Sequence, residues 1–379
     1  MKLLSFIFIG LFGQTISAKC TDINNLRPPL VEITEKKNLF RTTQTITKTP
    51  RHQDSIGWCY AHAAADLLSH RLGKEVSAVD LANAYSSGSW DLRLQKYFGF
   101  AEESNIEGGH AKQAANKGLN RGLCLEKNLP SSDFNFSRNY DNYQKEMADL
   151  EKIFHLYYRQ TTTPSRLNRF GANIHYKKSD HELKRINQNF RQQLSCRAEL
   201  FADWQSIFPN LSIDQLMNAL SQSSASYQFL RKMIEKSCEP RLSFNNLKVS
   251  SVNRNQGFSL YDTYINNVDQ QKEHERRASV IMNKIDEQLN KGDIIAVSYS
   301  SSILRNPANA NYQRPSDHAS TIVARRYNSQ KNQCEYLLRN TWGRGCSYYA
   351  SSYDCDNGHI WLPQEVIKKS VTGVDYLEN

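Results

Sequence analysis

Four residue types that together support thiol-based acyl transfer occur in this chain. Cys59 stands at the start of a predicted helix, and Gln53 lies six positions before it. His318 and Asn340 follow far downstream. An imidazole can activate a thiol for attack on an amide carbonyl, an asparagine can orient that imidazole, and a glutamine N–H can stabilise the oxyanion. The combination predicts hydrolysis of a peptide or amide bond.

The predicted nucleophile is Cys59. Only a thiolate attacks efficiently, and the unpaired N–H groups and dipole of a helix N-terminus lower the pKa of a thiol placed there. The alternative, that Cys59 is half of a disulfide, is disfavoured by its flanking sequence.

The predicted base is one of ten histidines. His318 precedes residues 320–323, a run rich in β-branched side chains, so we expect it at the mouth of a strand. His62 is the main rival because it lies one helical turn after Cys59, but its side chain should point away from the thiol. His52 is a weaker rival, and His110 could line the site.

The predicted orienting group, Asn340, ends a strand pattern and precedes Trp342. Its amide oxygen can accept a hydrogen bond from the imidazole, and the indole can keep water away from that bond. The alternative is a strand-end asparagine that turns the chain with the help of Gly343.

The elements around these residues fall into two groups. Helical patterns come first, at residues 59–72, 77–85 (capped by Ser77), 110–116, 142–158, 180–208, 213–238 and 277–289. Strand patterns dominate afterwards, at residues 293–299, 320–324, 336–340 and 359–362. This order predicts an α+β protein with a helical lobe and a β-rich lobe.

The polar block at about 131–272 interrupts the domain that we assign to residues 52–379. We predict a mostly helical insertion that flanks or caps the site, and the alternative is an independent domain. Before this domain, residues 1–18 resemble a secretory signal, with Lys2 and a short apolar run, and residues 19–51 read as an extended arm. Lys19 before Cys20 disfavours lipidation, so we expect a secreted or periplasmic protein.

Bulk composition limits the partners. The formal net charge is +10, spread along the chain, and no nucleic-acid motif accompanies it. We therefore expect a solvated basic surface, no nucleic-acid partner, no stable membrane insertion, and a monomer that needs no metal or cofactor.

The cysteines predict disulfides, since the signal implies export. Seven remain once Cys59 is set aside, so at least one is free or bonded to another molecule. Nearness in the chain suggests the pairs Cys196–Cys238 and Cys346–Cys355, although sequence cannot fix connectivity.

Taken together, these residues resemble the papain family of cysteine peptidases. The segments that carry the resemblance follow the family's order and comprise Gln53 and residues 56–60, 105–111, 317–319, 338–343 and 358–361. Residues 56–60 match the family signature C-G-[SA]-C-[WY] in part. The resemblance implies a papain-like two-lobe fold and catalytic roles for Cys59, His318, Asn340 and Gln53. It also implies that a protein or peptide substrate contacts Gly108, Gly109, Trp58, Ala319 and Trp342.

The chain departs from the family pattern in several places. Ile56 replaces a cysteine that normally forms a disulfide beside the site, and Trp58 replaces a small residue. His318 lies farther from Cys59 than the roughly 130–150 positions typical of the family, and the helical block explains the excess. Too few residues separate Ala18 from Gln53 for the family's helical pro-segment.

Two other functions stay open. One is a non-catalytic binding protein that reuses the fold, although all four reactive groups persist. The other is a thiol amidase or transamidase that acts on cell-wall peptides, for which the positive charge would suit an anionic wall.

Overall fold

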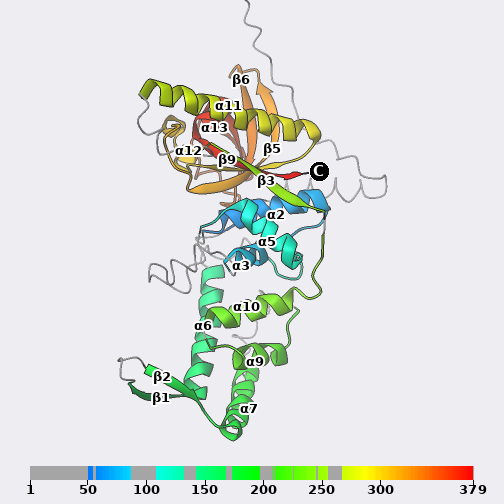
Figure 1. Cartoon of the computed structure of the whole chain (residues 1–379), viewed down its shortest axis with the longest axis vertical. Coiled ribbons are helices and arrows are strands. Elements are labelled where there is room, and N and C mark those ends of the chain that lie inside the picture. The colour runs from blue at the N-terminus through cyan, green and yellow to red at the C-terminus, as the bar shows by residue number, and fades with distance from the viewer. Residues whose placement is uncertain are drawn as a thin grey trace, which may run out of the picture.

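The computed structural model of the 379-residue chain describes residues 50–53, 57–86, 108–131, 142–167, 173–196, 208, 210–224, 226–244, 246–254 and 267–378. The predicted signal, Cys20 and most of the predicted arm lie outside these residues. Within the described ranges, several helices lie apart from a large antiparallel sheet and others pack on it, which confirms the α+β class (Figure 1). None of the described helices combines the length and apolar character needed to cross a bilayer.

The helical lobe consists of α2 (Cys59–Leu72), α3 (Ala78–Ser86) and α5 (Ala111–Arg121), which pack on one another. As predicted, α2 begins at Cys59 and ends where Gly73 takes a left-handed conformation with φ 63°. Ser77 Oγ accepts a hydrogen bond from Asp80 N at 3.2 Å, so the predicted cap of α3 is present. Small alanines let α2 lie buried between the other two helices and strand β5 (His318–Asn328).

The sheet lobe is built on a seven-stranded antiparallel sheet, counted over the described residues. In spatial order its strands are β3 (Lys248–Asn253), β9 (Val371–Glu378), β4 (Ile295–Tyr299), β5 (His318–Asn328), β6 (Gln333–Arg339), β8 (His359–Pro363) and β7 (Asp354–Asp356). The long helix α11 (Asn267–Lys291) and α13 (Gln364–Ser370) pack on this sheet, and α12 (Ser302–Arg305) and a 3-10 turn (Pro307–Asn309) follow β4.

All four predicted strands are present, with shifted ends, but three were missed. β7 is short, β9 follows a helix without a clear turn signal, and β3 lies inside the range predicted for the insertion. β3 pairs with β9 over its whole length, so residues 248–253 belong to the sheet lobe.

The helical extension comprises α6 (Asn142–Thr161), strands β1 (Thr162–Leu167) and β2 (Asn173–Lys177), α7 (Asp180–Cys196), α9 (Ile213–Ser221) and α10 (Ser226–Ser237). The helix predicted at 213–238 is two helices, and the hairpin of β1 and β2 was not predicted. Helix α10 contacts α3, and the extension leads away from the sheet lobe (Figure 1). The described part of the extension therefore does not reach toward the sheet lobe to cap a site there.

A disulfide fixes the root of this extension, together with an ion cluster of Asp80, Arg121 and Arg241. Cys238 bonds to Cys124, so the predicted pair Cys196–Cys238 is wrong. The physical reason is a backbone pairing: Leu123 and Leu242 exchange hydrogen bonds of 2.7 and 2.9 Å, which brings the chain entering and leaving the extension together. The predicted pair Cys346–Cys355 is confirmed.

A second ion cluster joins the two lobes. The Asp66 carboxylate on α2, 0% exposed, accepts hydrogen bonds of 2.8 Å from Arg51 Nε and from Arg339 Nε on β6. Burial alone would raise the pKa of Asp66, but the two guanidinium groups outweigh it and hold that pKa below its usual value. The segment before Cys59, the helical lobe and the sheet lobe thus share one buried carboxylate.

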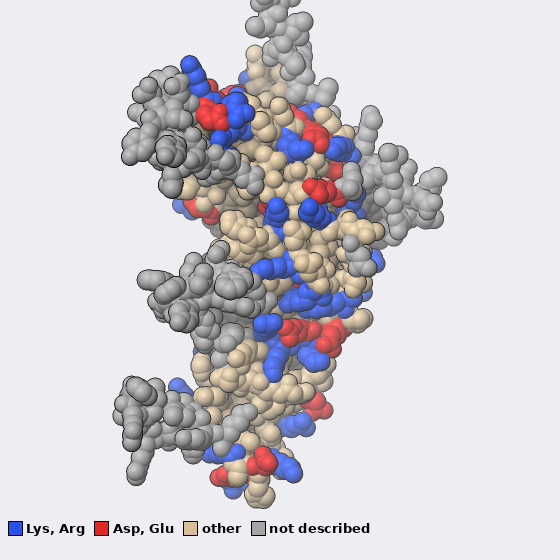
Figure 2. Space-filling model, in the orientation of Figure 1, with Lys and Arg blue, Asp and Glu red and all other residues tan. Residues whose placement is uncertain are grey.

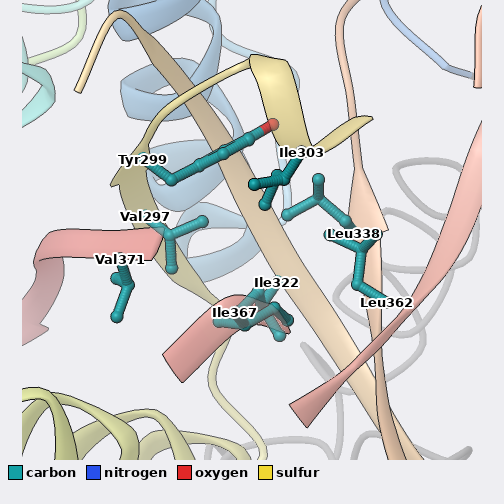
Figure 3. Close-up of a pocket in the computed structure, with 8 residues that line it drawn as sticks. All are labelled: Val297, Tyr299, Ile303, Ile322, Leu338, Leu362, Ile367 and Val371. Atoms are coloured by element: carbon teal, nitrogen blue, oxygen red, sulfur yellow. The ribbon is translucent and has the colours of Figure 1, made fainter. Parts of the chain in front are cut away.

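The sheet lobe also encloses an apolar cavity, which is unrelated to the predicted chemistry. Its walls are Val297, Tyr299, Ile303, Ile322, Leu338, Leu362, Ile367 and Val371 (Figure 3). The surface that lines it is hydrocarbon, so the cavity is part of the core rather than a polar binding site.

Candidate active site

Cys59 occupies the first turn of α2 and faces the sheet lobe. Trp58 precedes the helix, and its carbonyl accepts hydrogen bonds from Ala61 N at 2.9 Å and His62 N at 3.1 Å. Cys59 is 9% exposed, and its thiol lies near the backbone of Ala319, the second residue of β5, which acts to lower the pKa of the thiol against the larger effect of burial. The predicted nucleophile on the helical lobe therefore lies beside the strand of the sheet lobe that begins with His318.

His318 and Asn340 form a direct pair. His318 is the first residue of β5 and pairs with Tyr299 on β4, while Asn340 directly follows β6. His318 Nε2 lies 2.7 Å from Asn340 Oδ1. Because an amide oxygen only accepts, Nε2 carries the proton, and Nδ1 is left as the basic nitrogen of the neutral ring.

The surroundings of Asn340 fix the orientation of its amide. Asn340 Nδ2 donates to the Tyr349 hydroxyl at 3.1 Å, and Ser320 Oγ donates to Asn340 Oδ1 at 3.0 Å. Since the Ser320 proton is used in this way, the Tyr299 hydroxyl, 2.8 Å away, is the donor to Ser320 Oγ. The donor and the acceptor of each of these hydrogen bonds are then assigned. Together the bonds hold the Asn340 side chain with its Oδ1 toward the imidazole.

Aromatic rings enclose the His318–Asn340 pair. The Trp342 ring centroid lies 5.3 Å from that of His318, and Tyr349 stacks on Trp342 at 6.0 Å. On another side, Tyr299 meets the imidazole edge-to-face at 5.6 Å. These contacts exclude water from the imidazole–amide hydrogen bond and hold the ring in place.

Burial favours the neutral forms of both reactive groups. Burial raises the pKa of the Cys59 thiol, although hydrogen bonds from the backbone of Ala319 and Tyr60 act in the opposite direction. Burial lowers the pKa of His318, while the hydrogen bond to Asn340 and the nearby Asp317 carboxylate act to raise it. Both groups are therefore neutral at rest, as a thiol and an uncharged imidazole.

Gln53 is held beside Asn340 by backbone pairing. Gln53 N donates to Thr341 O at 2.9 Å, and Gly343 N donates to Arg51 O at 3.3 Å. Thr341 Oγ1 donates to Gln53 Oε1, which fixes the side-chain amide at its oxygen end. The segment that leads to Cys59 and the segment that follows Asn340 therefore run side by side.

The residues predicted to contact substrate differ in accessibility. Gly108 and Gly109 are exposed, and Gly108 N donates to Gly57 O at 2.9 Å, which places the glycines beside the approach to Cys59. A side chain at Gly109 would clash with the rings of Tyr60 and Tyr85. Trp342 is half-buried, Ala319 offers mainly its backbone, and Trp58 is only 3% exposed, so its indole has little surface for a substrate.

The three rival histidines lie in other environments. His62 is buried beside Arg51, Asp66 and Arg339, and burial lowers its pKa to about 3. His52 packs against Gly343, and His110 is exposed before α5. None of them shares the hydrogen bond to Asn340 that His318 makes.

Sequence reasoning missed Tyr299, Ser320 and Tyr349 as supports of the site. Ser320 and Tyr299 were included in predicted strands, but nothing in their spacing indicated a polar role. The signal that could have found Ser320 is alternation, because it lies two residues after His318 and so shares its face of the strand.

The chain was also compared with known proteins. No family model matches it, and no curated protein matches it. Solved structures similar to it include a structure concerning the mite allergens Blo t 1 and Der p 1 (12% identity, 88% of this chain and 67% of that chain, TM-score 0.37). Another is digestive procathepsin L 3 of Tenebrio molitor larval midgut (10% identity, 88% of this chain and 66% of that chain, TM-score 0.37). A third is PepW from Lactobacillus rhamnosis HN001 (12% identity, 86% of this chain and 79% of that chain, TM-score 0.36). At these TM-scores we base no argument on the likeness.

Proposed function

We propose that this chain is a secreted cysteine peptidase of papain-like architecture that hydrolyses peptide bonds through a thioester intermediate. Cys59 is the nucleophile, His318 the general base and acid, and Asn340 the group that orients His318. The Cys59 backbone N–H and the Gln53 side-chain amide stabilise the oxyanion.

Two neighbouring contacts where the lobes meet give the proposal its main support. The Cys59 thiol touches the backbone of Ala319, and the adjacent His318 ring is fixed by Asn340 at 2.7 Å. If these residues had only a structural role, the imidazole would not need to be buried and oriented so that one of its nitrogens is left as a base. A thiol nucleophile, a base and an orienting group are the parts needed for covalent acyl transfer.

Acylation follows from this arrangement. His318 Nδ1 takes the thiol proton as Sγ bonds to the scissile carbonyl carbon, and the carbonyl π electrons move to oxygen. Each oxyanion donor is worth about 3 kcal/mol at this stage. The imidazolium then gives its proton to the leaving nitrogen, the C–N bond breaks, and an amine departs from a Cys59 thioester.

Deacylation reverses these roles. His318 takes a proton from water as the water oxygen attacks the thioester carbonyl. The second tetrahedral intermediate collapses with cleavage of the C–S bond, and the acid product leaves. The imidazolium returns its proton to Cys59, so no cofactor is consumed.

Export and monomeric action complete the proposal. Two disulfides, Cys124–Cys238 and Cys346–Cys355, suit an oxidising compartment. Lys and Arg side chains are spread over the visible face with Asp and Glu among them, which suits a solvated surface (Figure 2).

Substitution of the nucleophile tests the proposal. Cys59→Ala should abolish hydrolysis of unfolded protein substrates and labelling by a thiol-directed epoxide, while circular dichroism stays unchanged. His318→Ala serves as the matched loss of the base. Cleavage that persists in Cys59→Ala would exclude this mechanism, and an inert, unlabelled wild-type protein would favour a non-catalytic binding role.

A further inference from the structure

Arg305 lies on the outer side of the Trp342 ring. It ends α12 and is exposed, and its guanidinium carbon is 5.8 Å from the Trp342 ring centroid. Within the described part of the chain, no carboxylate forms an ion pair with Arg305. An exposed cation is thus fixed over the indole that covers the catalytic imidazole.

The chemistry of the proposed reaction determines what passes this point. His318 must protonate the leaving nitrogen, so the first residue after the scissile bond lies next to the imidazole. Trp342 packs on that imidazole at 5.3 Å, and Arg305 packs on Trp342. The chain on the leaving-group side of the substrate therefore runs toward Arg305.

Resting on the proposed peptidase function, we infer that Arg305 and Trp342 form a leaving-group subsite that selects a carboxylate within two residues after the scissile bond. The carboxylate belongs to an Asp or Glu side chain or to the C-terminus of a short substrate. The guanidinium can bind it bidentately, while the indole supports the substrate backbone.

Other charges near this subsite also favour an anion. Arg314 Nη1 donates to Ser302 Oγ at 2.8 Å at the start of α12, and Arg344 is exposed two residues after Trp342. The opposing charge is Asp317, whose carboxylate accepts hydrogen bonds from Ser301 N at 2.5 Å and Ser301 Oγ at 3.0 Å. Arg305 and Arg314 outnumber Asp317 around α12.

The test measures kcat/KM on quenched peptides that differ only after the scissile bond, with Asp, Asn or Lys at the first or second position. A separate pair of peptides ends at the second position, in a free carboxylate or in an amide. This pair distinguishes recognition of a C-terminus from recognition of an Asp or Glu side chain. For the wild-type protein we expect a preference of about 5- to 10-fold for the acidic peptides, weakened by salt. Arg305→Gln should remove the preference, and Arg305→Glu should reverse it toward Lys.

Arg231→Gln on α10 is the matched control, since it removes an arginine with a 45% exposed side chain from the helical extension. It should leave every ratio unchanged. Binding of the same peptides to Cys59→Ala, followed by fluorescence anisotropy, reads the subsite without turnover. If the wild-type protein cleaves none of the peptides, only the peptidase proposal is refuted. If Arg305→Gln keeps the wild-type preference for acidic over amide peptides in both the kcat/KM and the binding assay, the subsite is refuted.

Discussion

Two buried polar networks lie where the lobes meet, and they differ in charge. The network around Asn340 is made of neutral groups and contains one titratable base, His318. The network around Asp66 joins that carboxylate to two guanidinium groups, of which Arg51 also pairs with Glu126. Arg339 and Asn340 are adjacent, so one strand end supplies both networks.

This difference in charge suits the two networks to different tasks, orienting a base and holding elements together. A neutral network can orient a base without forcing it to stay charged, because its hydrogen bonds have fixed directions but small net charge. An ion cluster holds elements together only while every charge has its partner, because an unpaired buried charge is very costly. We therefore expect changes around Asp66 to affect folding and changes around Asn340 to affect turnover.

The largest expected effect is on stability. Asp66→Ala leaves Arg51 and Arg339 buried without their shared carboxylate. We expect a loss of about 3–5 kcal/mol in the free energy of unfolding, measured with urea. The control is Asp214→Asn, at a carboxylate whose side chain is 75% exposed, which should cost little. Equal stability of Asp66→Ala and wild type would contradict the assigned role of the ion cluster.

The next effect is on turnover. Asn340→Ala removes the acceptor that orients His318, so kcat should fall on the order of 10²-fold. The loss of stability should be smaller than for Asp66→Ala, about 1–3 kcal/mol, because only neutral groups lose partners. A variant with full kcat would show that His318 needs no orienting amide.

A smaller effect concerns acid stability. Burial, assisted by Arg339, lowers the pKa of His359 to about 4, whereas an unfolded histidine titrates near 6.5. The unfolded state binds more protons between these values, so the free energy of unfolding should fall by about 1–2 kcal/mol between pH 6.5 and 5. His359→Gln should make this slope shallower in thermal melts, and substitution of the exposed His155 should not.

The smallest effect is a shift of the pH–rate profile. Activity requires the one proton shared by Cys59 and His318, and kcat/KM falls when a second proton binds or the first is lost. Asp317 raises the pKa of both groups, so Asp317→Asn should move both limbs of the profile to lower pH. Limbs that stay in place, as we expect for Asp214→Asn, would exclude this coupling.

The sequence by itself determined the local features of this protein. Helix α2 was predicted from residue 59 to 72 because alanine- and leucine-rich spacing and a left-handed glycine are local signals. His318 and Asn340 were predicted at strand ends because a run with Thr321, Ile322 and Val323 follows His318 and the strand pattern at 336–340 ends at Asn340. The α+β class followed from the order of these patterns along the chain.

Only the tertiary structure decided which distant groups meet. Cys124 pairs with Cys238, and Asp66 binds both Arg51 and Arg339, because separate segments run side by side in the folded chain. The same holds for Ser320 and Tyr349, whose hydroxyls reach Asn340 from different elements. Such contacts depend on the packing of the two lobes, which no local periodicity specifies.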